Sequence, residues 1–445
     1  MIAGRSADAV LAYRGGEPIS AGQFLADVQR LAPLLGAGRH VLNACTDRYH
    51  FLVGFAACLV SGKVNLLPPT HTAEVLRQLT RFAPDVICLT DDPEGASSLP
   101  SVQFPRSVAP LLPVMSVPQI ETDQLAAYVF TSGSTGTPVA HRKTWGRLVE
   151  CVCQEVVQLG LDADVAATLV ATVPPQHMYG FESSVLLPLL GGMVLCAERP
   201  FYPADIAAVL ASVPRPRVLV STPVHLRALL AAGITLPSLE LIVCSTAPLP
   251  QQLATEVEER FEAQLLEIYG STETGQIAVR RPTATAEWRL WSGVQLEARG
   301  SETWAQNGHI EQPTRMCDVL ELTGEGRFLL HGRVADLVNI AGKRSSLAYL
   351  NHQLNSIPGV QDGAFFHMED TRSSHTGVTR LAACVVAPEL EPARLLAALR
   401  ERIDPVFLPR PLLFVARLPR NSTGKLPQEA LRSLAAGQAK PARAV

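Results

Sequence analysis

Thr131-Ser132-Gly133-Ser134-Thr135-Gly136-Thr137-Pro138 is the most informative segment of this 445-residue chain. It follows Ala126-Ala127-Tyr128-Val129-Phe130, whose apolar and β-favouring residues predict a buried strand. Small hydroxyl residues and glycines leave little side chain to fill a core, and they expose backbone N–H groups and hydroxyls to one point. The segment therefore predicts a loop that cradles phosphate groups.

Two other interpretations of this segment compete with a phosphate cradle. A Walker loop needs a lysine directly after its last glycine, and here Gly136 is followed by Thr137 and Pro138, so that interpretation is rejected. A flexible Gly/Ser linker has a similar composition. A linker does not explain why a strand leads directly into the segment.

Three further motifs follow downstream. They are Tyr269-Gly270-Ser271-Thr272-Glu273, then Gly332-Arg333-Val334-Ala335-Asp336 with Gly342-Lys343-Arg344, then Leu418-Pro419-Arg420-Asn421-Ser422-Thr423-Gly424-Lys425-Leu426. In this order the four motifs resemble the adenylate-forming superfamily of acyl-CoA synthetases, aryl acid ligases, peptide-synthetase adenylation domains and luciferases. The resemblance covers the chain from Tyr128 to its end.

Composition limits the classes of function. The 38 basic and 41 acidic residues give a net charge of −3, which offers no basic stripe for nucleic acid. The nine cysteines show no C-x-x-C pair of the kind found in zinc or redox sites, and we expect buried, reduced thiols. The N-terminus lacks the apolar core of a signal peptide, and no apolar run reaches the ~20 residues that span a bilayer. We therefore expect a cytoplasmic protein with no membrane span.

Alternating strands and helices predict an α/β fold with a large, layered N-terminal domain of mainly parallel sheets. The pattern predicts helices over 20–35, 47–61, 72–82, 144–159, 205–211, 224–232 and 251–262, with strands at 40–44, 64–67, 85–90, 165–173, 217–221, 239–244 and 265–268. Three short strands (337–340, 363–368, 381–387) and two helices (347–356, 392–402) then predict a small α+β domain.

The resemblance implies two domains with different tasks. Residues 1–336 would bind ATP and the carboxylic acid, and residues 337–445 would form a mobile domain that carries the catalytic lysine. The hinge between them is expected at Asp336. Closure about this hinge would bring Lys425 to the reacting groups, and rotation would expose a second face for attack by a thiol.

The implied reaction joins a carboxylate to the α-phosphate of ATP and expels pyrophosphate. Its site must neutralise phosphate charge and hold Mg²⁺, so electrostatic preorganisation should dominate the catalysis. The resemblance assigns the catalytic roles to Lys425, Thr272, Glu273 and His177, with Thr272 on the α-phosphate and Glu273 on the metal. Nucleotide-binding residues would be Thr131, Ser132, Gly133, Ser134, Thr135, Gly136, Tyr269, Gly270, Ser271, Asp318 and Arg333.

Ordinary structural roles remain open for several of these residues. Glu273 could be a helix N-cap partner, Asp318 a solvated turn residue matched by spacing alone, and Arg333 a member of a surface ion pair. Lys425 could be a surface lysine. Gly342 would let a phosphopantetheine arm approach closely, and a plain turn explains it equally well.

The expected carboxylate pocket contains His177, Tyr179, Phe181, Ser245, Thr246, Ala247 and Gly270, with His177 as the gate. A lone histidine is as often a structural residue. Ser245 and Thr246 stand where many relatives carry glycines, which predicts a short, polar pocket suited to a hydroxylated aryl acid.

The chain departs from the family pattern at Val139, where the phosphate loop usually has a lysine, and Arg142 and Lys143 are the nearest cations. The chain resembles the acyl carrier protein ligases of aryl polyene and xanthomonadin pigment clusters. The resemblance lies in its compactness and in segments 143–148, 342–347 and 357–360. That narrower resemblance implies a hydroxybenzoate such as 3-hydroxybenzoate as the acid and a carrier-protein phosphopantetheine as the acceptor.

Three alternative functions remain open. Free CoA could replace the carrier protein in an aryl- or fatty-acyl-CoA ligase. A silent ligand-binding homologue is suggested by Val139, and the presence of Lys425, Glu273 and Thr272 argues against it. An amino acid adenylation module would need an acidic residue for the ammonium, where this chain has His225. The sequence does not specify the oligomeric state.

Overall fold

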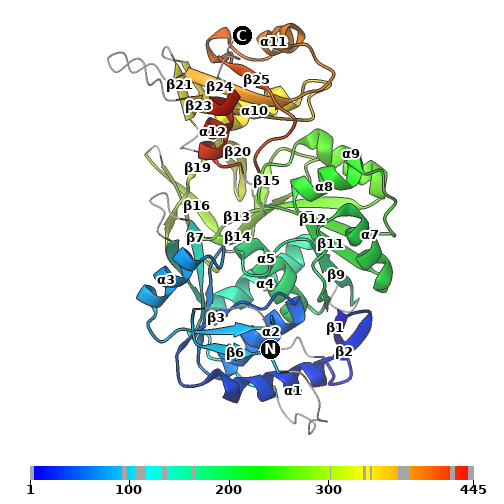
Figure 1. Cartoon of the computed structure of the whole chain (residues 1–445), viewed down its shortest axis with the longest axis vertical. Helices are drawn as coiled ribbons and strands as arrows, with labels where there is room; N and C mark the ends of the chain where they lie inside the picture. The colour runs from blue at the N-terminus through cyan, green and yellow to red at the C-terminus, as the bar shows by residue number, and fades with distance from the viewer. Residues whose placement is uncertain are drawn as a thin grey trace, which may run out of the picture. The chain divides into compact units, whose positions relative to one another are not determined.

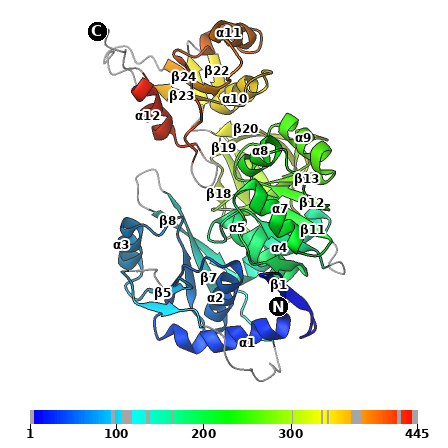
Figure 2. The same ribbon diagram turned by 45° about the vertical axis from the view of Figure 1, so that its right-hand side comes forward.

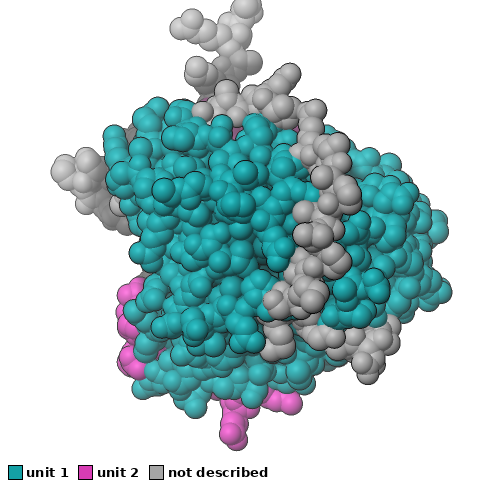
Figure 3. All heavy atoms as spheres, turned by 90° about the horizontal axis from the view of Figure 1, so that it is seen from below, with its two compact units in different colours: residues 1–297, 305–314 teal, residues 298–304, 315–445 magenta. Residues whose placement is uncertain are grey.

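The structure is a computed structural model of the chain. It describes residues 5–92, 98–105, 117–132, 138–161, 166–300, 302–333, 337–340, 343–368, 380–420 and 426–438. Contacts divide the chain into unit 1, made of residues 1–297 and 305–314, and unit 2, made of residues 298–304 and 315–445 (Figure 3). Asp336 lies outside the described residues, so the domain boundary and hinge assigned to it stay predictions.

Unit 1 contains two large sheets. The order of the first, within this unit, is β15-β14-β13-β12-β11-β9-β10-β1-β2, with parallel pairing from β13 through to β1. Its strands are β1 (Val10–Arg14), β2 (Glu17–Ser20), β9 (Thr168–Ala171), β10 (Val194–Cys196), β11 (Arg217–Ser221), β12 (Leu241–Cys244), β13 (Gln264–Ser271), β14 (Gly275–Arg280) and β15 (Trp288–Leu290).

The second sheet of unit 1 has the order β6-β5-β3-β4-β7-β8. Its strands are β3 (His40–Asn43), β4 (Val64–Leu67), β5 (Ile87–Thr90), β6 (Ser101–Gln103), β7 (Leu125–Ser132) and β8 (Pro138–Thr144). All neighbours are parallel except β7 and β8, which form an antiparallel hairpin at one edge.

A helical layer lies between the two sheets. Helix α2 (Arg48–Val60) contacts β3 and β4 on one side and β10 on the other, and α4 (Trp145–Leu159) contacts both β8 and β14. The chain continues this layer with α5 (Met178–Phe181), a π-helical turn (Glu182–Leu186) and α6 (Leu187–Gly191). Phe55 of α2 meets Phe181 of α5 edge to face with ring centroids 5.0 Å apart, so aromatic packing holds the layer together.

Outer helices complete five layers in unit 1. Helices α7 (Pro203–Ser212), α8 (Pro223–Ala231) and α9 (Gln251–Phe261) cover the outer face of the first sheet (Figure 1). Helix α3 (Ala73–Phe82) covers the second sheet on the face opposite α2 (Figure 2). Successive side chains of β3 point to opposite faces of the second sheet. Leu42 packs with α3 on one face, and Asn43 donates to the carbonyl of Phe51 in α2 on the other.

Local signals fix where the first helices begin. Ser20 caps α1 (Ala21–Leu31) in a capping box with Gln23, as predicted, and a 3-10 helix (Ala32–Leu35) with a proline in its first turn completes the predicted segment. Asp47 caps α2 by accepting from the amides of Tyr49 and His50 at 2.9 and 3.0 Å.

Unit 2 contains a hairpin, a small paired ribbon and a three-stranded sheet. Its strands are β19 (Asp318–Gly324), β20 (Arg327–Arg333), β21 (Leu337–Ile340), β22 (Lys343–Ser346), β23 (Asp362–Met368), β24 (Arg380–Val386) and β25 (Leu412–Phe414). The helices are α10 (Leu347–Asn355), α11 (Pro392–Arg400), a 3-10 turn (Pro405–Phe407) and α12 (Gln428–Gln438). A further sheet of β16 (Gln295–Arg299), β17 (Glu302–Gln306) and β18 (Thr314–Arg315) has residues divided between the two units.

Side chains of β23 alternate between two small cores. Phe365 packs with Leu350 of α10 and Leu395 of α11, whereas Phe366 packs on the other face with Leu431 of α12. This two-sided sheet gives unit 2 its own hydrophobic core.

The predicted α/β class, with large layered sheets and a smaller α+β portion, is confirmed. All cysteines are buried except Cys153 and Cys317, which corrects the expectation of buried thiols at these two positions. In the part of the chain that the structure describes, every helix is too short or too polar to span a bilayer.

Candidate active site

Four parallel strands end at the same edge of the first sheet. In register, Ala171 of β9 lies beside Val220 of β11, Ser221 beside Cys244 of β12, and Cys244 beside Glu267 of β13. The carboxyl ends of parallel strands are where ligands of open α/β sheets bind. The predicted residues His177, Ser245–Ala247 and Tyr269–Glu273 all follow or end these strands, so the fold brings their segments to this one edge.

The predicted phosphate loop connects the two strands of the β7–β8 hairpin. Thr131 pairs with Val139 and Ser132 with Pro138 in this hairpin. Gly133, Ser134, Thr135 and Gly136 lie outside the described residues. The buried strand predicted to lead into this loop is β7.

A short turn after β13 presents Thr272 and Glu273. The amide of Thr274 donates to Ser271 Oγ, and the amide of Ser271 donates to Thr274 Oγ1, each at 3.2 Å, which closes the turn. Before the turn, a Cβ on Gly270 would lie 2.3 Å from the carbonyl oxygen of Gly275, so only glycine fits there. The ring of Tyr269 packs against Trp288, and the carboxylate of Glu273 stays 40% exposed.

The segment of His177 is shaped by a close approach of the backbone. A Cβ on Gly180 would lie 1.9 Å from the carbonyl oxygen of Pro174, so glycine allows α5 to start directly after this turn. His177 is the half-buried N-cap residue of α5. Tyr179 donates to the carbonyls of Ser221 and Val243 at 3.3 and 3.0 Å, and Phe181 is fully buried; their places in a pocket wall stay predictions.

The loop after β12 contains a residue whose backbone conformation is rare for residues other than glycine. Ser245 Oγ donates to the carbonyl of Ile268 at 2.9 Å, which ties this loop to β13. Thr246 has a φ of 83°, in the left-handed region, and is half-buried like Ala247. Strained backbone of this kind concentrates at binding and catalytic sites.

Unit 2 holds two of the residues predicted to bind the nucleotide. Asp318 of β19 and Arg333 of β20 are direct cross-strand partners in an antiparallel pair.

Lys425 lies outside the described residues, and Arg420 is an anchored residue that precedes it in the same motif. The guanidinium of Arg420 donates to both oxygens of Asp362 on β23, at 2.9 and 2.8 Å. This bidentate pair fixes the backbone just before the predicted lysine loop.

The two cations nearest Val139 differ in their surroundings. Val139 and Arg142 are exposed on β8, whereas Lys143 is buried and its Nζ donates to the carbonyl of Glu273 at 3.2 Å. Burial lowers the pKa of Lys143, and nearby Glu182 opposes that shift. Lys143 is therefore held at the Glu273 turn.

Sequence reasoning missed a buried acidic cluster beneath this turn. Ser183 donates to Glu155 Oε1 at 2.6 Å, Gln276 donates to Ser183 at 2.7 Å, and the thiol of Cys151 donates to Glu182 at 3.1 Å. Burial raises the pKa of Glu155 to about 8 and that of Glu182 to about 7. Glu155 and Glu182 lie in apolar helical stretches, and only the unusual charge at a core position could have signalled them.

His141 is a second residue that the sequence did not indicate. Its Nε2 lies 3.0 Å from Thr131 Oγ1 and 3.7 Å from Glu273 Oε1. It therefore lies between the start of the phosphate loop and the predicted metal ligand, which belong to different sheets.

The donor set at the Glu273 turn fits Mg²⁺ bound together with a nucleotide. A partly exposed carboxylate has the hydroxyls of Thr272 and Ser271 as neighbours in sequence, and Mg²⁺ prefers such oxygen ligands. The described residues contain no cluster of three or more acidic, histidine or cysteine side chains that could hold a metal by themselves. Mg²⁺ needs only one or two carboxylates when phosphates supply the other ligands.

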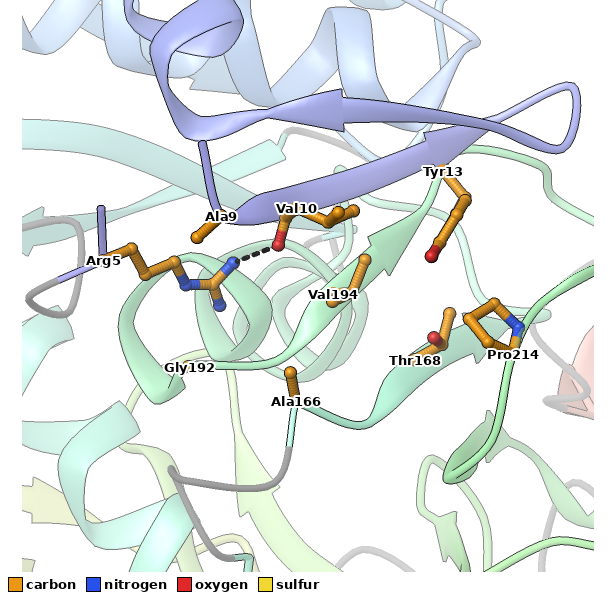
Figure 4. A pocket seen from close by; sticks show the side chains of 9 residues that line it. All are labelled: Arg5, Ala9, Val10, Tyr13, Ala166, Thr168, Gly192, Val194 and Pro214. Carbon is orange, nitrogen blue, oxygen red and sulfur yellow. Dashed lines mark hydrogen bonds between the residues drawn. The ribbon is translucent and has the colours of Figure 1, made fainter. Parts of the chain in front are cut away.

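A cavity of about 410 Å³ lies at the opposite edge of the first sheet (Figure 4). It is lined by Thr168 and Val194, the first residues of β9 and β10, and by Arg5. The guanidinium of Arg5 donates to the carbonyl of Val10 at 3.3 Å. Because the predicted site residues follow the carboxyl ends of these strands, this cavity is separate from them.

The chain is similar to known proteins in sequence and in fold. The sequence profile of the AMP-binding enzyme family matches residues 2–320. A 4-coumarate–CoA ligase of Rhodobacter capsulatus is 29% identical over 299 residues, covering 66% of this chain and 73% of that protein, and a feruloyl-CoA synthase of an Amycolatopsis species is 26% identical over 347 residues, covering 68% of each. The solved o-succinylbenzoate CoA synthetase of Bacillus subtilis, in complex with its acyl-adenylate, superimposes with a TM-score of 0.78 at 18% identity, covering 94% of this chain and 93% of that one.

Proposed function

Because this chain belongs to the AMP-binding enzyme family and is an AMP-forming acid–thiol ligase, we propose that its acid is a small aryl carboxylate, with a hydroxybenzoate such as 3-hydroxybenzoate as the first candidate. The observation that carries this proposal is the half-buried Ser245-Thr246-Ala247 loop at the carboxyl edge of the sheet. Side chains there would narrow a pocket next to β13 and would line it with hydroxyls. The names of the relatives, 4-coumarate–CoA ligase and feruloyl-CoA synthase, also specify aryl acids.

The first half-reaction forms the acyl-adenylate. A carboxylate oxygen of the acid attacks the α-phosphorus of ATP, and the bond from that phosphorus to the leaving pyrophosphate breaks. The loop from Thr131 through Ser132 to Gly136 would hold the β- and γ-phosphates, and Thr272 would donate to the α-phosphate. Mg²⁺ held by Glu273 would neutralise phosphate charge.

The remaining assigned residues would position the two anions. Asp318 would hold the ribose, and Arg333, its cross-strand partner, would contact the ribose or a phosphate. Lys425 would contact the carboxylate and an α-phosphate oxygen together, because a lysine is a compact point charge on a flexible stem. His177, at the start of α5, would close the carboxylate pocket, with Gly270 beneath it.

The second half-reaction transfers the acyl group to a thiol. The thiolate sulfur attacks the acyl carbon, the bond from that carbon to the adenylate oxygen breaks, and AMP leaves. We propose the phosphopantetheine thiol of an acyl carrier protein as the acceptor, in the biosynthesis of an aryl polyene or xanthomonadin type of pigment. Free CoA is the alternative acceptor, and it is the one in the names of the relatives.

The test of this function is ATP-dependent pyrophosphate release with benzoates, hydroxybenzoates, cinnamates and fatty acids. We expect release with a hydroxybenzoate, and we expect Lys425→Ala to abolish it while Lys440→Ala, at a lysine outside all four motifs, keeps it. Each active acid is then offered with CoA or with a phosphopantetheinylated carrier protein, and the thioester is identified by mass spectrometry. Release with fatty acids alone would contradict the aryl substrate, and silence with every acid would favour a ligand-binding homologue.

A further inference from the structure

Strand β8 contacts the predicted metal-binding residue at two points. His141 and Lys143 are two residues apart, so they lie on the same face of the strand. His141 Nε2 lies 3.7 Å from the carboxylate of Glu273, and Lys143 Nζ donates to the carbonyl of the same residue at 3.2 Å. Strand β8 of the second sheet thus reaches both the carboxylate and the backbone carbonyl of Glu273, which lies on the turn between β13 and β14 of the first sheet.

His141 also reaches the entrance of the phosphate loop. Its Nε2 lies within hydrogen-bond distance of Thr131 Oγ1, at 3.0 Å, and Thr131 is the first residue of the phosphate-loop motif. Either neutral tautomer can make this contact, because a hydroxyl both donates and accepts. One imidazole nitrogen therefore faces an oxygen from each of the two motifs that should meet at the nucleotide.

The other residues of β8 near His141 have different surroundings. Val139 carries no charge and is 48% exposed, Arg142 is exposed, and Lys143 donates to a backbone carbonyl. In the described part of the hairpin, His141 is the ring that bridges toward both Thr131 and Glu273. Its side chain is only 16% exposed, so packing on β8 limits its rotation.

Resting on the proposed function, we propose that His141 is a positioning residue that holds the Glu273 carboxylate and the Thr131 hydroxyl in the arrangement that accepts Mg·ATP. Its imidazole restrains the carboxylate from the side of the second sheet, and Lys143 fixes the backbone beneath it. Ligands that are held in place before binding lose less conformational freedom when the metal arrives.

The experiment is calorimetric titration with α,β-methylene-ATP, whose scissile link cannot be cleaved, in the presence of Mg²⁺ and again in EDTA. We compare wild type with His141→Val, which keeps a β-favouring shape, and His141→Gln, whose amide nitrogen reaches about as far as Nε2. The matched control is His40→Val, which removes another histidine of the same sheet, paired with Asp85 at 2.7 Å.

We expect His141→Val to weaken binding of the Mg²⁺ complex by roughly tenfold. Binding of the metal-free nucleotide should weaken much less, because that nucleotide loses only the placement of the Thr131 hydroxyl. A merely structural role would not separate these two affinities. His141→Gln should bind the Mg²⁺ complex with an affinity within a few-fold of wild type. His40→Val should bind it as tightly as wild type does. If His141→Val is poorly folded, His141→Asn replaces it, because the shorter amide does not reach the Nε2 position.

Two results would overturn the proposal, and they are distinguishable. Equal Mg·nucleotide affinity in wild type and folded His141→Val would remove the positioning role and leave the ligase function intact. Failure of wild type to bind the nucleotide at all would remove the proposed function, and the role of His141 with it.

Discussion

Glu155 carries a carboxyl group that is fully buried in the helical layer of unit 1. Burial raises its pKa to about 8 from an ordinary value of 4.5, so it stays protonated in the folded protein at neutral pH. Between these two values the unfolded chain has lost this proton and the folded chain still holds it. The contribution of Glu155 to stability is therefore unfavourable in this window, and it worsens by about 1.4 kcal/mol per pH unit as pH rises.

We expect Glu155→Gln to remove this pH-dependent cost. The stability difference between the variant and wild type should increase steadily from pH 5 to pH 8 in urea denaturation experiments. Glu150→Gln, on the same helix but 43% exposed, should show no such trend. Parallel pH profiles for wild type and Glu155→Gln would contradict the buried, protonated state.

Thr246 adopts its left-handed backbone conformation at a cost of about 1–2 kcal/mol relative to glycine. Thr246→Gly should relieve that strain, and the greater freedom of glycine in the unfolded chain should cancel about half of the gain. We expect a small rise in the thermal midpoint together with activity toward bulkier aryl acids. Thr246→Ala keeps the strain, so it should change the acid preference without the rise. A lower midpoint for Thr246→Gly would show that the threonine is not strained.

At the scale of elements, Arg48 joins α2 to the end of β9. Its buried guanidinium donates to the carbonyls of Ala171 and Val173 at 3.0 and 2.9 Å and to the hydroxyl of Ser184. Burial lowers its pKa to about 10, which still leaves a cation at neutral pH. The segment that leads to His177 is thus held by α2.

We expect Arg48→Met to destabilise unit 1 by about 3 kcal/mol or more, because three hydrogen bonds to a charged group are lost and their carbonyls stay buried. Urea denaturation measures the loss. Arg77→Met, at an arginine whose side chain is 60% exposed, should fall within about 0.5 kcal/mol of wild type. A similar small effect for both variants would contradict the anchoring role of Arg48.

The sequence predicted elements with a strong periodic pattern and missed those without one. The capped helices α1 and α2 and the parallel strands β3, β4, β11 and β12 were expected close to their observed bounds. Strand β8 was missed because His141-Arg142-Lys143 does not alternate between apolar and polar, as an edge strand need not. The helices between Met178 and Gly191 were missed because they are buried all round and show no polar face.

The site was predictable only where its residues form local motifs. Thr272 and Glu273 belong to one such motif, and they lie on a turn at the carboxyl edge of the first sheet. The contacts of His141 and Lys143 with Glu273 join strands of different sheets, and no local pattern contains that information. The strain at Thr246 is likewise a backbone property that only the fold reveals.

At the scale of the whole molecule, the pair of Asp362 and Arg420 ties the start of the motif that contains Lys425 to β23 in unit 2. We expect Asp362→Asn to slow pyrophosphate release by roughly tenfold, because one lost bidentate contact is worth about 1–2 kcal/mol in positioning the loop. Arg315→Lys alters an exposed pair with Glu302 in the same unit and should leave the rate unchanged. An unaffected rate in folded Asp362→Asn would show that the loop is positioned by other contacts.

Two cysteines are exposed and the other seven are buried, so the protein has two native positions at which a dye can be attached. Burial raises the pKa of Cys58 to about 12 and that of Cys384 to about 11, so few buried thiols ionise and react at neutral pH. Cys153 and Cys317 are exposed, and one belongs to each unit. A donor and an acceptor dye attached at these two native positions would report, through energy transfer, whether ATP, the acid and the thiol each change the distance between the units.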